Sequence, residues 1–224
     1  MWKNSCGSHL GTGSYLLFSQ NSRNWTQADG IVDFVNGGKI VMSVGKLIVI
    51  SGPGGVGKST IVDLVRNNST FYFSVSATTR LPRPGEENGV AYRFISESAF
   101  DGMIEGGLFL EWAEFAGARY GTPRAPVMDA LNSGKHVLLE IEIQGARQVK
   151  ASIPTAVMVF IAPPSIEELL ERLRSRGTDS PERIAARLNL ARSEMAAMGD
   201  FDHVLVNHRV EDCVNALLSL ATST

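Results

Sequence analysis

A glycine-rich octapeptide carries the clearest chemical signal in the sequence. The run Gly52-Pro53-Gly54-Gly55-Val56-Gly57-Lys58-Ser59 matches the pattern G-x-x-x-x-G-K-[ST], and Thr60 follows it. Glycines let backbone N–H groups converge on a phosphate without Cβ clashes. Lys58 would supply positive charge to the β- and γ-phosphates, and the Ser59 hydroxyl can take one Mg²⁺ coordination position. The pattern predicts a nucleoside triphosphate site and leaves the reaction open.

The segments on either side of this loop are those that such a phosphate site needs. Residues 46–51 form an apolar, β-branched run typical of a buried strand, and residues 59–67 predict a helix. The positive end of that helix dipole would point at the phosphates. The alternative, a glycine-rich turn with a chance lysine, is disfavoured because both flanking elements are present.

Strands and helices alternate along the rest of the chain. Strands are predicted at residues 71–77, 90–95, 109–115, 136–141, 156–162 and 203–206, and helices at residues 97–105, 124–132, 165–176, from 181 onward, and 211–220. Ser165 and Glu168 have the spacing of a capping box, and Pro181 suits a first helical position. This alternation predicts an α/β fold with a parallel sheet covered on both faces.

Composition narrows the function classes. The 224 residues include 21 basic and 23 acidic ones, for a net charge of −2, which gives no support for a nucleic-acid or membrane-surface partner. Cys6 and Cys213 form neither a metal-ligand pattern nor a disulfide framework, and a reducing compartment fits them. No apolar run approaches the roughly 18 residues that span a bilayer. We therefore expect a cytoplasmic protein without a membrane partner.

Several later segments, in order, resemble the guanylate kinase family. They are residues 73–86 (FSVSATTRLPRPGE), 89–94 (GVAYRF), 109–115 (FLEWAEF), 120–122 (YGT), 161–165 (IAPPS) and 176–178 (RGT). The resemblance runs from about Lys46 to the C-terminus. It implies a P-loop kinase fold, with a central parallel sheet flanked by helices, a small β-rich GMP-binding subdomain and a helical lid. It also implies transfer of the ATP γ-phosphoryl group to GMP, and to dGMP, in purine nucleotide metabolism, with Mg²⁺ as cofactor and ATP as co-substrate.

The chemistry of the residues in these segments fits a guanine nucleotide. Arg80 and Arg83 lie three apart in a proline-stiffened loop and could face one phosphate. A carboxylate can accept hydrogen bonds from the guanine N1–H and exocyclic amine, while O6 and N7 need donors. The resemblance assigns GMP to Ser76, Arg80, Arg83, Tyr92, Glu111, Tyr120, Thr122 and Glu142. Taken singly, these residues would more often belong to a solvated loop, a half-buried strand or a surface strand.

The sequence departs from the family pattern at three positions. Glu140 and Glu142 end the predicted central strand, where the family commonly has aspartate, and Gly54 stands where serine is usual. Glutamate keeps the charge and adds one methylene. We expect Glu140, with Ser59, still to hold Mg²⁺, either directly or through a water. Glycine at position 54 should loosen the loop without removing a required donor.

Three arginines are predicted to close over the phosphates. Arg172 and Arg176 are four apart on one predicted helix, and Arg187 lies on the next; the resemblance makes them lid residues that act with Lys58 in catalysis. The alternative for Arg172 is a surface ion pair with Glu168. No general base is named, because a phosphate monoester is already largely anionic near neutral pH, its second pKa being about 6.

Two regions are predicted along the chain. Residues 1–45 are rich in Gly, Ser and Asn and are expected to form a flexible extension, or to arise from an upstream start if translation begins at Met42. Residues 46–224 would form the kinase domain. Its core is predicted at 46–75, 134–164 and 203–224, the GMP-binding subdomain at about 76–126, and the lid at about 165–196. A monomer or a small homo-oligomer is expected.

Three alternative functions are open on the sequence alone. The first is a kinase for AMP or a pyrimidine nucleotide, which the paired Glu and Ser/Thr positions disfavour. The second is a catalytically silent module that binds a peptide, which is disfavoured because Lys58 and the arginines are kept. The third is a phosphoribosyl-bisphosphate kinase on the same scaffold, which should lack the guanine-binding set.

Overall fold

The computed structural model describes residues 32–35, 38–41, 44–175, 177 and 179–223, in two units that divide after Val41. In the first unit, β1 (Val32–Val35) and β2 (Gly38–Val41) pair antiparallel, with Val32 opposite Val41. The sequence did not predict these two strands. Most of the predicted extension, including residues 1–31, lies outside the described residues.

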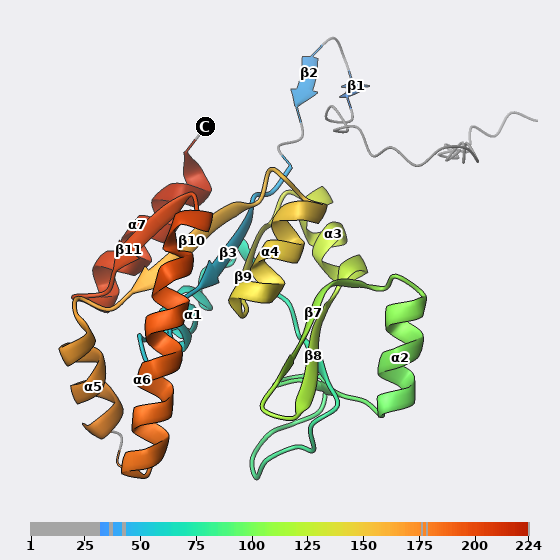
Figure 1. Cartoon of the computed structure of the whole chain (residues 1–224). Coiled ribbons are helices and arrows are strands. Elements are labelled where there is room, and N and C mark those ends of the chain that lie inside the picture. Colours follow the sequence, from blue (N-terminus) through green and yellow to red (C-terminus); the bar gives the residue numbers. More distant parts are fainter. Residues whose placement is uncertain (1–31, 36–37, 42–43, 176, 178, 224) are drawn as a thin grey trace, which may run out of the picture. The chain divides into compact units, whose positions relative to one another are not determined.

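The second unit is built on a five-stranded parallel sheet, as predicted (Figure 1). The strand order is β11 (His203–Val206), β10 (Val157–Ala162), β3 (Leu47–Ser51), β9 (His136–Glu140) and β4 (Phe71–Phe73). Ile50 of β3 pairs with Glu140 of β9 on one side and with Val159 of β10 on the other. Because parallel strands end at the same edge, the loop after β3 lies beside the acidic end of β9.

Apolar layers cover both faces of this sheet. The side chains of β3 alternate, so Ile48 and Ile50 face one layer, while Leu47 and Val49 face the other. The first layer is completed by α1 (Lys58–Val65) and α7 (Val210–Thr222). The second is completed by α3 (Arg124–Asn132) and α4 (Ile143–Ser152). Of these two helices, the sequence predicted α3 but not α4.

A second, four-stranded sheet holds much of residues 77–123. Its order is β6 (Arg93–Phe94), β5 (Ala77–Thr78), β8 (Ala118–Pro123) and β7 (Phe109–Phe115), and α2 (Glu97–Glu105) packs Phe100 against Phe109. The strand predicted at 71–77 is in fact two strands, because the chain leaves the first sheet at Phe73 and enters the second at Ala77. The strand predicted at 90–95 is shortened to β6.

Two helices and a short 3₁₀ turn form the region predicted as a lid. They are α5 (Ile166–Ser175), α6 (Pro181–Met195) and η1 (Ala196–Asp200). The Ser165 hydroxyl accepts from the Glu168 N–H at 3.1 Å, and Pro181 is the first residue of α6, so both predicted helix starts are confirmed. Leu169, Leu173 and Ala191 are buried in a cluster of their own.

Over the residues that the structure describes, we find no helix with the length and apolar character needed to cross a membrane.

Candidate active site

The loop between β3 and α1 has a backbone that requires glycine, most clearly at Gly52 and Gly57. Gly52 has φ +141°, and a Cβ there would lie 2.2 Å from the Ile161 carbonyl oxygen. Gly57 has φ +100°, and a Cβ would lie 2.7 Å from Asn207 Nδ2. Neither position accepts another residue without distortion. The loop is therefore built on close backbone approaches and leads directly into α1, as a phosphate-binding loop requires.

The Lys58 ammonium lies over this loop. Its Nζ donates to the carbonyl oxygens of Gly52 at 2.5 Å and Pro53 at 3.1 Å. These bonds hold the side chain across the concave side of the loop, the side that a phosphate would occupy. At Gly54, by contrast, the nearest atom to an added Cβ is Arg187 Nη2 at 3.9 Å. A serine would fit there, so the departure from the family pattern is not forced by space.

The two residues predicted to hold a metal are brought together. The Ser59 hydroxyl donates to Glu140 Oε1 at 3.0 Å, across the junction of α1 and β9. Burial raises the pKa of Glu140; nearby Lys58 and the Ser59 bond oppose that shift, and Glu142 adds to it. A hydroxyl and a carboxylate at this separation are hard oxygen donors of the kind that Mg²⁺ prefers.

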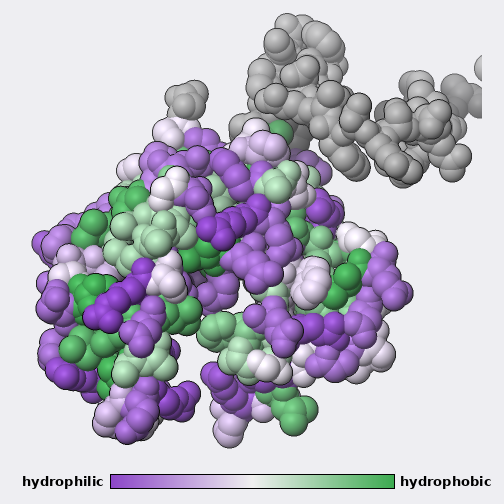
Figure 2. Space-filling model, viewed as in Figure 1, coloured by the Kyte–Doolittle hydropathy of each residue, from purple (hydrophilic) through white to green (hydrophobic). Residues whose placement is uncertain are grey.

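A cavity of about 310 Å³ lies between the second sheet and the end of β9. The space-filling view shows the surface hollowed between the α5–α6 side and the β7–β8 side (Figure 2). Of the predicted acceptor residues, the cavity wall includes Ser76, Arg80, Arg83, Tyr92, Glu111, Tyr120 and Glu142, and Glu140 lines it as well. Residues scattered over 67 positions of the chain thus converge on one space.

Glu111 is a buried carboxylate in this wall, only 5% exposed. Thr122 donates its hydroxyl hydrogen to Glu111 Oε1 at 2.5 Å, so this predicted guanine donor is bonded to Glu111 here. Burial raises the pKa of Glu111, and the bonds from Thr122 oppose the shift. Gly145 of α4 makes room for the group, since a Cβ there would lie 2.3 Å from Glu111 Oε2.

The Arg80 guanidinium is held from several sides. Glu86 accepts from Arg80 Nη1 and Nη2 at 2.9 Å each, and from the Arg83 N–H at 2.7 Å. The Tyr92 ring centroid lies 5.4 Å from the Arg80 Cζ. The hydrogen bonds that Arg80 donates to Glu86 raise the pKa of its guanidinium, and its Nε is buried without a partner among the residues that the structure describes. A fixed cation with a free N–H suits an anionic ligand.

Comparison with known proteins decides the family. The family described as guanylate kinase matches residues 44–223. The chain belongs to the guanylate kinase family. A guanylate kinase of Streptomyces coelicolor is 55% identical over 176 residues, covering 78% of this chain and 89% of the relative. One of Nocardia farcinica is 54% identical over 183 residues, covering 80% and 95%.

A solved member of the family has the same fold. The crystal structure of guanylate kinase from Anaplasma phagocytophilum superimposes with a TM-score of 0.65 at 32% sequence identity, covering 81% of this chain and 89% of that one. This agreement confirms the predicted P-loop kinase fold of the guanylate kinase family.

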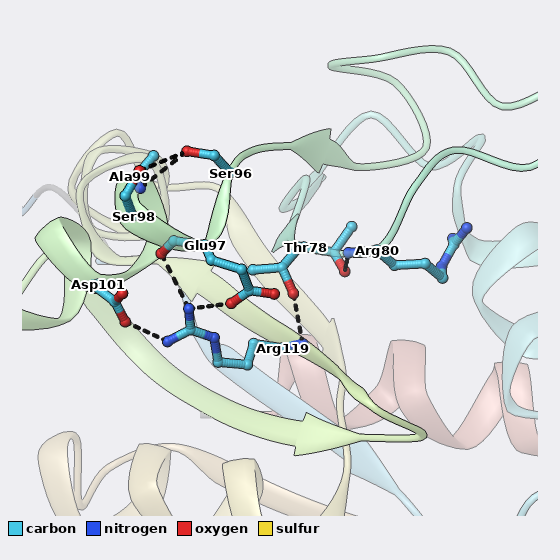
Figure 3. Close-up of polar contacts among 9 residues, drawn as sticks. Thr78, Arg80, Ser96, Glu97, Ser98, Ala99, Asp101 and Arg119 are labelled. Carbon is cyan, nitrogen blue, oxygen red and sulfur yellow. Dashed lines mark hydrogen bonds and ion pairs between the residues drawn. The ribbon is translucent and has the colours of Figure 1, made fainter.

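The side chain of Arg119, on β8, joins α2 to the strands of the cavity wall (Figure 3). The Arg119 guanidinium bonds the Glu97 carboxylate, the Glu97 carbonyl oxygen at 3.0 Å and Asp101 Oδ1 at 2.5 Å. It also lies 4.8 Å from the centre of the Phe100 ring. The backbone N–H of Arg119 donates to Thr79 Oγ1 at 3.0 Å. These contacts thus join α2 to β8, which carries Tyr120, and to Thr79, the neighbour of Arg80.

The predicted lid arginines occupy different settings. Arg172 bonds the carbonyl oxygens of Asn207 at 2.8 Å and Val56 at 3.4 Å, besides its predicted ion pair with Glu168. Arg187 is paired with Asp179, whose side chain is 7% exposed. Arg176 lies outside the described residues. Arg172 therefore contacts the phosphate loop directly, and Arg187 lies near it at Gly54.

Sequence reasoning missed three residues that build the site. Glu86 was quoted within a family segment but given no role, although it is three residues from Arg83 and carries the charge that an arginine pair needs. Gly145 and Gln148 lie on the unpredicted α4, and the Gln148 side chain bonds the Trp112 backbone N–H and carbonyl at 3.1 and 2.7 Å. Only the packing of α4 against β7 shows that both residues support Glu111.

Proposed function

We propose that this guanylate kinase family member transfers the γ-phosphoryl group of ATP to GMP, giving ADP and GDP, and that it accepts dGMP as well. One observation carries the proposal: a buried carboxylate and a held arginine, Glu111 and Arg80, face the same cavity as Glu140, the neighbour of the phosphate loop. A purine monophosphate bound there would present its phosphate toward the triphosphate site.

The donor would bind at the phosphate loop, residues 52–60. The loop N–H groups and the N-terminal dipole of α1 would bind the β-phosphate, and Lys58 would exchange its two carbonyl partners for phosphate oxygens. Ser59 and Glu140 would hold Mg²⁺, which supplies charge neutralisation between the β- and γ-phosphates when bound. The adjacent wall with Arg172 and Asn207 is open to the rest of ATP.

The acceptor would bind across the cavity. Glu111 would accept hydrogen bonds from the guanine edge, with Ser76 as a hydroxyl donor and Glu142 on the opposite wall. Arg80, Arg83, Tyr92 and Tyr120 would hold the phosphate. The Tyr92 and Tyr120 rings are 5.8 Å apart in an edge-on arrangement, and both line the cavity.

The chain's main task would be to bring two anions together. Transfer passes through a loose transition state, and the acceptor oxygen needs no strong general base because it is already anionic. Lys58, Arg172, Arg176 and Arg187 would offset the repulsion, and the acceptor residues would align the attack. Movement of the lid, residues 165–196, over the site would exclude water and suppress hydrolysis of ATP.

The test is a coupled assay with ATP and Mg²⁺. We expect turnover with GMP and dGMP, and at least about a hundredfold lower kcat/KM with AMP, CMP and UMP, because none of those bases presents the adjacent N1–H and exocyclic amine donors that Glu111 would accept from on guanine. A folded protein that makes no GDP would overturn the proposal.

Two finer points belong to the same proposal. A cytoplasmic location is supported by the free, buried thiol of Cys213, which suits a reducing compartment. The domain limits are proposed as predicted, with the GMP-binding subdomain at about 76–126 and the kinase domain beginning near residue 46.

A further inference from the structure

An aromatic side chain without a polar group lies at the acceptor cavity. Phe115, the last residue of β7, lines the cavity and is 47% exposed. The described pairs of neighbouring aromatic rings do not include Phe115. A large apolar ring that is both exposed and inside a polar cavity is a candidate ligand contact.

The register of β7 fixes the direction of this ring. Side chains of a strand alternate between its faces, so Glu111, Ala113 and Phe115 share one face, and all three line the cavity. Trp112 on the other face packs against Phe100, with ring centroids 6.3 Å apart. The irregularity of β7 lies between Phe109 and Glu111, and pairing with β8 is regular beyond it. Along β7, the cavity wall therefore presents the buried carboxylate of Glu111, then the methyl group of Ala113, then the exposed ring of Phe115.

A tight turn holds the ring in place. Phe115 pairs with Ala118, and the two residues between them, Ala116 and Gly117, have φ values of +51° and +77°. Positive φ at both central residues is what a type I′ hairpin turn requires. A left-handed conformation is unfavourable for alanine, so this turn is maintained by the pairing around it.

We propose that Phe115 is a GMP-binding residue whose ring packs against the guanine base held at its edge by Glu111. The inference rests on the proposed function and adds a residue to it. Glu111 can bond only the edge of a purine, and the other two aromatic rings of the cavity wall, Tyr92 and Tyr120, are proposed above to hold the phosphate. The base also has apolar faces, and aromatic stacking is the contact that such a face favours.

The experiment measures steady-state kinetics for Phe115→Ala and Phe115→Tyr. We expect Phe115→Ala to raise KM for GMP about tenfold, within the range found for loss of base stacking, with KM for ATP unchanged. Phe115→Tyr keeps the ring and should stay within about twofold of wild type. Val90→Ala removes another exposed apolar side chain, 69% exposed and outside the cavity wall, and should leave both KM values unchanged.

A second measurement separates stacking from edge recognition. IMP lacks the exocyclic amine, so loss of the ring should weaken GMP and IMP by the same factor, whereas Glu111→Gln should reduce the preference for GMP over IMP. An unchanged KM for GMP in folded Phe115→Ala would overturn the inference, as would a change confined to oligomeric state. Wild-type protein that forms no GDP would instead overturn the proposed function.

Discussion

At Lys58, two loop carbonyl oxygens accept hydrogen bonds from the ammonium at 2.5 and 3.1 Å. This charge is available to a phosphate at little cost in free energy, because Lys58 would replace its hydrogen bonds to carbonyl oxygens with hydrogen bonds to phosphate oxygens. At Glu111 the reverse holds, since burial disfavours the charge that a guanine edge needs. The Lys58 ammonium is therefore already charged and placed for a phosphate. The charged form of Glu111 would be stabilised only when guanine donates hydrogen bonds to it.

Replacing Lys58 with methionine removes the charge and keeps the length of the side chain. We expect kcat to fall at least about a hundredfold, by analogy with the loss of one charge-stabilising group in other active sites. The melting temperature should change little, because both described hydrogen bonds of Lys58 are made to its own loop. Steady-state kinetics and thermal unfolding test this. A folded variant with near-normal kcat would show that the loop does not hold the transferred phosphate.

The raised pKa of Glu111 predicts a pH dependence of GMP binding. Guanine needs the ionised carboxylate, so KM for GMP should rise as pH falls through the raised pKa and stay level above it. The GMP phosphate adds its own rise below about pH 6. Glu111→Gln shares the phosphate effect but lacks the carboxylate, so the difference between the two profiles isolates Glu111. Parallel profiles for the two proteins would contradict the assignment.

At the scale of elements, the sequence predicted what periodicity and caps can specify. The core strands at residues 47–51 and 203–206, α2 and the starts of α5 and α6 follow from apolar runs and from Ser165 and Pro181. It did not predict α4, whose start has no side-chain cap at Glu142, nor the break between β4 and β5. Alternation within 71–77 cannot tell one strand from two strands in different sheets.

The same limit applies to the site. The sequence could predict the phosphate loop because its residues are contiguous and each has a stated task. It gave a set of polar residues expected to bind GMP only through the resemblance. The contacts of Glu86 with Arg80, and of Gly145 with Glu111, join distant or unpredicted elements. Such contacts depend on how α4 packs on β7, which local pattern does not specify.

The packing of α4 on β7 gives a prediction at this scale. Gly145→Ala would place a Cβ 2.3 Å from Glu111 Oε2, and α4 or the carboxylate must move. We expect KM for GMP to rise at least about tenfold and stability to fall by about 1–3 kcal/mol, as in other overpacked sites. Enzyme kinetics and denaturant unfolding measure the two effects.

Gly102 supplies the matched control for that substitution. It lies within α2, and an added Cβ there meets no atom within 4 Å. Gly102→Ala should therefore leave KM unchanged and stabilise the protein by about 0.5–1 kcal/mol through helix propensity. If Gly145→Ala behaved like Gly102→Ala, α4 would not constrain Glu111.

For the molecule as a whole, the proposed reaction needs parts of two sheets. The phosphate loop follows β3 of the five-stranded sheet and Glu140 ends its strand β9. Glu111 lies on β7 of the other sheet, Arg80 lies in the segment after β5, and the acceptor cavity lies where these parts meet. Each sheet has its own apolar cluster. Leu110 of β7 is also buried in one cluster with Leu47 and Val49 of β3, so the second sheet is packed against the core that holds the phosphate loop.

The kinase domain should fold and act without the first 41 residues. The second unit, Met42–Thr224, contains every apolar cluster described above and every described residue of the candidate site, and the family match covers residues 44–223. A protein that begins at Met42 should therefore keep the melting temperature, kcat and both KM values of the full chain. Side-by-side thermal unfolding and kinetics of the two proteins test this. A kcat reduced more than about threefold, or a cooperative transition lost on truncation, would mean that residues 1–41 contribute to the kinase domain, since an independent domain needs only its own core to fold.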